Sequence, residues 1–84
     1  MKPIRFSQHA LQQIVVRGAS RNEVIDTIRT GGKAPAKRGR WKFRQNFPYN
    51  DLWGGRMYAI KQVMAVVAED AYALVVVTVY TFYF

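Results

Sequence analysis

The sequence predicts an α+β fold in which two N-terminal helices pack on a three- or four-stranded antiparallel sheet. Within the first 30 residues, apolar side chains recur every three or four positions, which is the spacing of a helix with one buried face. From Trp41 onward, apolar and polar residues alternate or apolar residues run continuously, which is typical of strands. A chain of 84 residues suffices for one domain, so we expect a single domain over residues 1–84.

Both predicted helices carry start and stop signals. Ser7 can cap the first helix by accepting a backbone hydrogen bond, and Gly18 can end it because glycine tolerates left-handed backbone. Ser20 and Glu23 form the S-x-x-E capping box that begins the second helix, and a pair of glycines at 31–32 ends it. The two helices should therefore be short and adjacent in the chain.

The remaining segments read as strands and connections. Trp41, Phe43 and Phe47 alternate with polar and cationic residues, which predicts a strand with one apolar and one cationic face. We expect a polar basic loop at residues 33–40, turns at Pro48 to Asp51 and at Gly54-Gly55, and strands from Met57 to Ala68 and from Ala73 to Tyr83. The last strand is the strongest prediction because it is rich in valine.

The charge is concentrated in the first half of the chain. Residues 1–44 hold eleven of the 13 Lys and Arg residues but only two of the five acidic ones. An acid-free run contains Arg29, Lys33, Lys37, Arg38, Arg40, Lys42 and Arg44. Such a run attracts polyanions, namely nucleic acid, an acidic protein or anionic lipid; the alternative is a solvated loop that only aids solubility.

Composition excludes several kinds of site. There is no cysteine, which rules out disulfides, thiolate nucleophiles and cysteine-based zinc sites. One histidine and scattered acids give no basis for a metal site, and no cofactor is expected. The N-terminus lacks the apolar core of a signal peptide, and the apolar stretch from Ala71 to Phe84 is shorter than the ~20 residues that span a membrane. We therefore expect a cytoplasmic protein.

Three groups of residues are candidates for chemistry. His9, the only histidine, lies early in the first helix and can act as both acid and base near neutral pH; alternatively it only packs or hydrogen-bonds locally. Lys42 and Arg44 share one face of a predicted strand and could grip a phosphate, with Arg44 binding it through two hydrogen bonds, unless that face is simply exposed. Arg40 and Arg56 are further cations that could reach a phosphate.

Thr78 and Tyr80 form the third group. They share one face of the apolar last strand, where a polar pair requires either hydrogen-bond partners or a binding site. Thr78 could bind a phosphate oxygen, and Tyr80 could orient a phosphate or donate a proton. The alternative is that both hydroxyls bond within the sheet.

Three short strings occur in a set order: Phe6-Ser7-Gln8-His9-Ala10, Arg17-Gly18-Ala19-Ser20 with Glu23-Val24, and Val77-Thr78-Val79-Tyr80. In this order they resemble a family of short prokaryotic domains related to the RelE/ParE-like and BrnT-like toxins of type II toxin–antitoxin systems. The resemblance implies a RelE-like fold and, as for many such toxins, RNA cleavage without metal. It also implies a partner, an acidic antitoxin.

Residues and resemblance together predict a toxin-like domain that binds RNA and cleaves it as a metal-independent ribonuclease. We expect His9, Lys42, Arg44 and Tyr80 to be catalytic, and we expect Arg40, Arg56 and Thr78 to bind substrate. Two alternatives remain: a non-catalytic module that binds nucleic acid or protein, and a ParE-like toxin that blocks a protein target. The apolar C-terminal strand could also form a homo-oligomer if it lies at a sheet edge.

Overall fold

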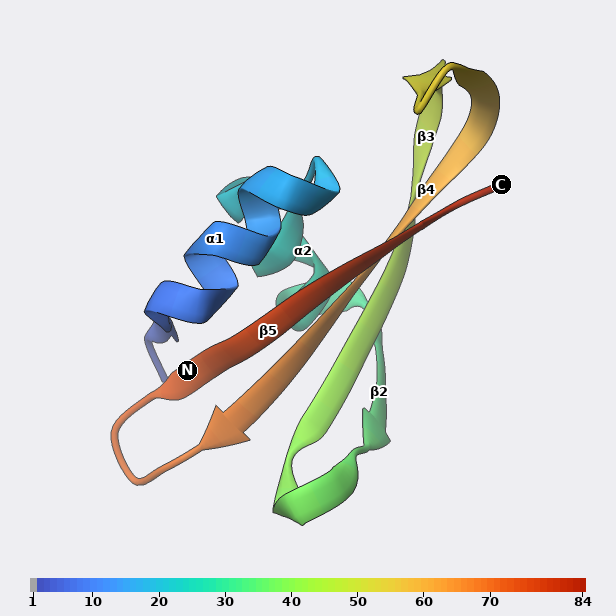
Figure 1. Ribbon diagram of the computed structural model, residues 1–84. Coiled ribbons are helices and arrows are strands. Elements are labelled where there is room, and N and C mark those ends of the chain that lie inside the picture. The colour runs from blue at the N-terminus through green and yellow to red at the C-terminus, as the bar shows by residue number, and fades with distance from the viewer. Residues whose placement is uncertain (1) are drawn as a thin grey trace.

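The computed structural model describes residues 2–84 and confirms the α+β class (Figure 1). The elements in order are β1 (Ile4–Phe6), α1 (Gln8–Arg17), α2 (Arg21–Thr30), β2 (Gly32–Pro35), the short 3-10 helix η1 (Lys37–Gly39), β3 (Trp41–Trp53), β4 (Arg56–Glu69) and β5 (Leu74–Tyr83). The five strands form one sheet in the order β1-β5-β4-β3-β2.

The sheet differs from the RelE-like arrangement that the sequence predicted. It has five strands rather than three or four, and it is mixed, because β1 pairs in parallel with the start of β5 from Ile4↔Leu74 to Phe6↔Val76. The expectation of a wholly antiparallel sheet was therefore wrong. The two additional strands, β1 and β2, have three and four residues, too few to display an alternating pattern in the sequence.

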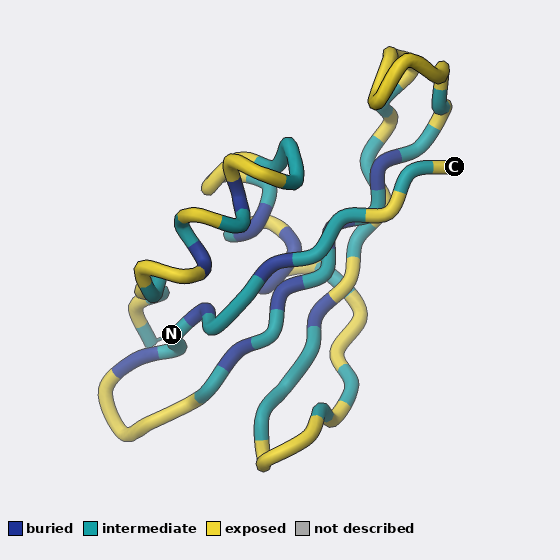
Figure 2. The backbone as a smooth tube through the Cα atoms, viewed as in Figure 1, coloured by how far each residue is buried: buried dark blue, intermediate teal, exposed yellow. Residues whose placement is uncertain are grey.

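Two segments that we expected to be connections belong partly or wholly to strands. The predicted loop at 33–40 begins with β2, which pairs with β3 from Gly32↔Arg44 to Pro35↔Trp41. The predicted turn at Pro48 to Asp51 is an irregularity inside β3, whereas the predicted turn at Gly54-Gly55 is confirmed, because the chain reverses there. The β3–β4 hairpin consequently extends past the rest of the sheet (Figure 1), and its tip is exposed (Figure 2).

The predicted helix caps are confirmed. The Ser7 hydroxyl accepts a hydrogen bond from the Ala10 N–H, and Gly18 ends α1 with φ of 73°. Ser20 and Glu23 form the reciprocal capping box of α2. These caps depend on contacts between residues only three positions apart, which is why the sequence alone located them.

Both helices cover the same face of the sheet, with α1 against β5 and α2 against β4 and β3 (Figure 1). Phe43, Ala65 and Val79 lie side by side in the sheet on this face, and all three are buried. The buried core comprises Ala10, Ile14, Val24, Ile28, Phe43, Val63, Ala65, Val67, Val76 and Val79. Neither α1 nor α2 packs on the opposite face of the sheet, which we call the open face.

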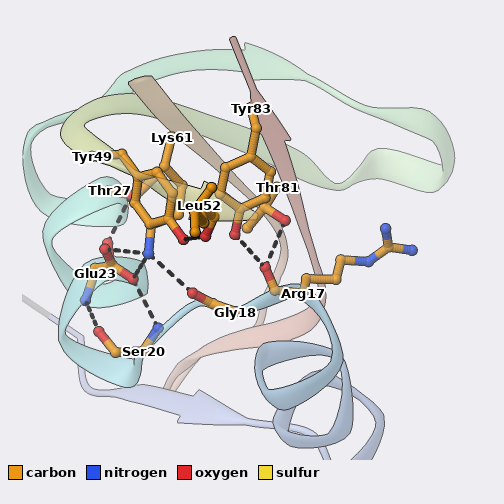
Figure 3. A network of polar contacts seen from close by, with 10 residues as sticks. All are labelled: Arg17, Gly18, Ser20, Glu23, Thr27, Tyr49, Leu52, Lys61, Thr81 and Tyr83. Carbon is orange, nitrogen blue, oxygen red and sulfur yellow. Dashed lines mark hydrogen bonds and ion pairs between the residues drawn. The ribbon is translucent and has the colours of Figure 1, made fainter. Parts of the chain in front are cut away.

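The end of α1 is attached to β5 by hydrogen bonds to one carbonyl (Figure 3). The Arg17 carbonyl accepts a hydrogen bond from the Thr81 hydroxyl at 2.9 Å and from the Tyr83 hydroxyl at 2.8 Å. Burial raises the pKa of Tyr83, which keeps the hydroxyl protonated and able to donate. A Cβ at Gly18 would lie 2.5 Å from the Trp53 ring, so this position requires glycine.

A nearly buried ion pair joins the sheet to the connection between the helices (Figure 3). The Lys61 ammonium lies 2.8 Å from a Glu23 carboxylate oxygen, and the Lys61 side chain is only 9% exposed. The ammonium also donates to the Gly18 carbonyl at 3.0 Å. The same carboxylate accepts the Ser20 N–H, so one lysine holds the capping box and the end of α1 together.

The turn between β4 and β5 should make the protein sensitive to acid. The Asp70 carboxylate accepts the N–H groups of Tyr72 and Ala73, both at 2.7 Å, and these bonds hold its pKa below the ordinary value of 3.8. A lowered pKa means that the stabilisation is present above pH 3.8 and is lost as the pH falls through the folded-state value.

We expect Asp70→Asn to flatten this loss, because the amide oxygen accepts the same bonds without titrating. The free energy of unfolding, measured by urea titration between pH 6 and about pH 2, checks this expectation. The hydrogen bond and ion pair with Lys2 also lower the pKa of Glu69. Glu69 should therefore supply part of the pH dependence of stability that remains in the variant. If the free energy of unfolding of the variant falls with pH as steeply as that of the wild type, Asp70 is not the source of the acid sensitivity.

Candidate functional site

Ser7 fixes the start of α1 against β5. Its N–H donates to the Val76 carbonyl at 3.0 Å, and its hydroxyl donates to the Val77 carbonyl at 3.1 Å. The register of β5 against β4 shifts at this point and leaves Val77 as an extra residue in the strand, a β-bulge. Because Ser7 is also the cap of α1, the first helical turn must lie beside this bulge.

His9 follows two residues after the cap and meets Thr78. Its Nε2 atom lies 3.3 Å from the Thr78 hydroxyl oxygen, and the tautomer of the ring decides which group donates. His9 is exposed, so an incoming molecule can reach the ring. The hydroxyl thus orients an accessible imidazole at the edge of β5.

A second side chain of α1 meets the next polar residue of β5. His9, Gln13 and Arg17 are spaced four apart and therefore lie along one side of the helix. Gln13 Oε1 accepts a hydrogen bond from Arg17 Nε at 3.1 Å, and the Arg17 guanidinium lies 4.9 Å from the centre of the Tyr80 ring. This cation–π contact fixes the ring of Tyr80 from the α1 side.

Two rows of side chains cross the open face from β3 to β5. In register, the first row consists of Lys42, Val66 and Thr78, and the second of Arg44, Met64 and Tyr80. Strands are about 4.8 Å apart, so the backbones of Lys42 and Thr78 are roughly 10 Å apart. In the second row, Arg44 Nε contacts the Met64 sulfur at 3.3 Å. The cations of β3 and the hydroxyls of β5 therefore share one surface.

A cavity of about 310 Å³ lies on this surface, and we call it the β5 cavity. It is lined by Ala36, Lys37, Arg38, Arg40, Val66, Thr78 and Tyr80. Arg38 and Gly39 adopt left-handed backbone, with φ of 63° and 70°, which curls the segment before β3. That segment brings three cations to the same hollow as the two hydroxyls of β5.

A second cavity of about 380 Å³, the β2 cavity, lies beside β2 and β3. It is lined by Gly32, Lys33, Ala34, Lys42 and Arg44. Lys42 and Arg44 thus lie at the β2 cavity, while their rows continue to the β5 cavity through Val66 and Met64.

The residues that line the two cavities include cations but no acidic residue. Three of the five acidic residues make their contacts elsewhere: Glu23 pairs with Lys61, Glu69 pairs with Lys2, and Asp70 closes the β4–β5 turn. Cations gathered without acidic neighbours create a positive potential, which attracts and holds anions.

The structure brings most of the predicted site residues together. Arg40, Thr78 and Tyr80 line the β5 cavity, and His9 contacts Thr78. Arg56 does not join them. It pairs with Trp53 at the tip of the β3–β4 hairpin, and at about 3.3 Å per residue it lies roughly 26 Å along β4 from Met64.

Sequence reasoning did not single out Arg17 as a site residue, although its spacing from His9 placed both on one side of the helix. In the sequence, Lys37 and Arg38 are only members of a basic run. Their position at the β5 cavity follows from the curl of the segment before β3, which tertiary contacts determine.

No protein-family model, curated protein or solved structure matches this chain. Within residues 2–84, no helix is long and apolar enough to cross a membrane. The same part of the chain holds no group of three or more His, Cys, Asp or Glu residues arranged to hold a metal ion.

Proposed function

We propose that this chain is a cytoplasmic toxin-like domain of a toxin–antitoxin system that binds RNA on its open face and cleaves it without metal. The observation that carries the proposal is the β5 cavity. Thr78, which lines it, contacts the only histidine, while Arg40 and Tyr80 complete a set of base, cation and hydroxyl. These groups come from separate segments of the chain.

RNA is the polyanion that this surface fits best. The cations of both cavities can hold phosphates, and Arg44 can do so through two parallel hydrogen bonds. Tyr80 lies beside them, and Phe82, which is 44% exposed, follows it on the same face of β5. Aromatic rings next to cations can stack on unpaired bases while the cations hold the backbone.

The chemistry requires a base, a cation and an acid. His9 takes the proton of a ribose 2′-hydroxyl, and the freed oxygen attacks the neighbouring phosphorus. Arg40 stabilises the additional negative charge on the phosphorus centre. The bond to the 5′-oxygen then breaks, and the Tyr80 hydroxyl supplies the proton that this oxygen takes up. The products are a 2′,3′-cyclic phosphate and a 5′-hydroxyl, and Thr78 keeps the imidazole in place.

An acidic antitoxin segment is the proposed protein partner. The acid-free lining of the two cavities supports this, because a segment rich in carboxylates would neutralise the same cations that hold RNA. β5 is a second contact candidate, since β1 pairs only with Leu74 to Val76 and a second copy of the chain could pair with the strand beyond.

The test is cleavage of a single-stranded RNA with excess chelator present. We expect fragments that end in a 2′,3′-cyclic phosphate, and we expect the same strand made of DNA to bind without being cleaved, because it lacks the attacking hydroxyl. Activity that disappears with chelator and returns with Mg²⁺ would contradict the metal-free route. Binding that falls steeply with salt, with no turnover, would instead identify a non-catalytic nucleic-acid-binding module.

A further inference from the structure

The β2 cavity has a floor made of residues with little or no side chain. Gly32 lies opposite Arg44, and Ala34 lies opposite Lys42, so all four residues point to the open face in two adjacent pairs. A Cβ at Gly32 would meet nothing within 4 Å. A side chain at Gly32 would therefore extend into open space, and a larger side chain at either position would take up part of the hollow.

The walls of this hollow are cations. Arg44 Nε is held against the Met64 sulfur at 3.3 Å, so this guanidinium stands on the side of the hollow nearer to β4. The Lys33 ammonium, in contrast, lies 4.1 Å from the centre of the Trp41 ring. Lys42 and Arg44 are consequently the two cations that can face an anion in the hollow.

We propose that the β2 cavity is a second phosphate site, which binds another phosphate of the strand whose scissile phosphate is held in the β5 cavity. This proposal rests on the proposed function for its choice of RNA as the ligand. Lys42 and Arg44 stand about two strand spacings, or ~10 Å, from Thr78 and Tyr80. A chain of nucleotides that lies across the strands can place phosphates one or two nucleotides apart at the two cavities.

The ligand is therefore an unpaired RNA strand rather than a duplex. In a duplex the bases are stacked and paired inside, so the Tyr80 and Phe82 rings would have no base face to contact. The two cavities also lie side by side across the open face, where a flexible single strand can follow both.

Ala34→Leu tests the second site, because it fills the floor of the hollow without changing the charge. Its matched control is Ala59→Leu, at an exposed position of β4 towards the hairpin tip. The probes are a single-stranded 2′-O-methyl RNA hexamer, which cannot be cleaved, and a nucleoside 5′-monophosphate, which carries one phosphate. Dissociation constants are measured by fluorescence anisotropy for the hexamer and by calorimetry for the monophosphate.

We expect Ala34→Leu to weaken hexamer binding about tenfold, since hydrogen bonds to one charged phosphate are lost. Binding of the monophosphate at the β5 cavity, which Ala34→Leu leaves unaltered, should change by less than about twofold. Ala59→Leu should behave as the wild type. Arg44→Gln, which removes one cation and leaves the floor intact, should lower the slope of log affinity against log salt by about 0.7.

The outcomes separate the second site from the function itself. If the wild type binds the hexamer and Ala34→Leu binds it equally well, the second site is wrong and the RNA function stands. A hexamer duplex that binds as tightly as the single strand would also contradict the proposal, because the proposal requires an unpaired strand. If the wild type does not bind the hexamer, the proposed function fails together with the second site. Thermal unfolding of each variant is measured to distinguish a loss of binding from a loss of the folded structure.

Discussion

His9→Ala is expected to lower the rate of RNA cleavage about 100- to 10,000-fold, the usual contribution of a positioned acid or base. The imidazole is the one group of its kind in the chain, and the Thr78 hydroxyl lies 3.3 Å from its Nε2 atom. Because His9 is exposed and makes no part of the core, its removal should leave the fold intact. The measurement is single-turnover cleavage with chelator present.

The control for this experiment is Gln12→Ala, an exposed position on the same helix. It should cleave RNA at the wild-type rate, and both variants should bind a non-cleavable strand as the wild type does. A loss of binding in His9→Ala that equals its loss of rate would assign His9 to substrate binding. Equal cleavage by the wild type and His9→Ala would remove His9 as the catalytic base.

Lys61→Met is expected to lower the free energy of unfolding by about 3 kcal/mol, the low end of the range for breaking a buried ion pair from one side. The Lys61 side chain is 9% exposed, and its loss leaves Glu23 and the Gly18 carbonyl without their cationic partner. Small domains have only about 5 kcal/mol of total stability, so much of the chain should unfold near 37 °C. Urea unfolding followed by circular dichroism measures the change.

Two comparisons isolate the cause. Lys2→Met removes an ion pair with Glu69 of similar length, 2.7 Å, but with both side chains more than a third exposed, and should cost at most ~1 kcal/mol. Glu23→Gln combined with Lys61→Met should be less destabilising than the sum of the two single changes, because no unpaired carboxylate remains. Additive effects would show that the pair itself contributes little.

The fold explains why the sequence could indicate candidate residues but not their arrangement. Lys42 and Arg44 share a face because side chains alternate along any strand, and Thr78 and Tyr80 share a face for the same reason. That both faces are the open face depends on the register of β4 between them and on the bulge at Val77. Neither of these can be deduced from alternation within one strand.

The sequence by itself determined the helices, their caps and the long strands. These features rest on hydrogen bonds and side-chain spacings within a few residues, as at Ser7, Gly18 and the pair of Ser20 with Glu23. It also determined the chemical types available to a site, including the one histidine and the acid-free basic run.

Only the tertiary structure decided the order of the sheet, the parallel pairing of β1, and the meeting of His9 with Thr78 across 69 positions of the chain. It also separated Arg56 from the other cations, because β3 continues through Pro48 to Asp51, the first of the two expected turns, and carries the hairpin tip away. These outcomes depend on contacts between distant segments. Such contacts form where apolar faces and strand edges fit together, and no local pattern in the sequence encodes them.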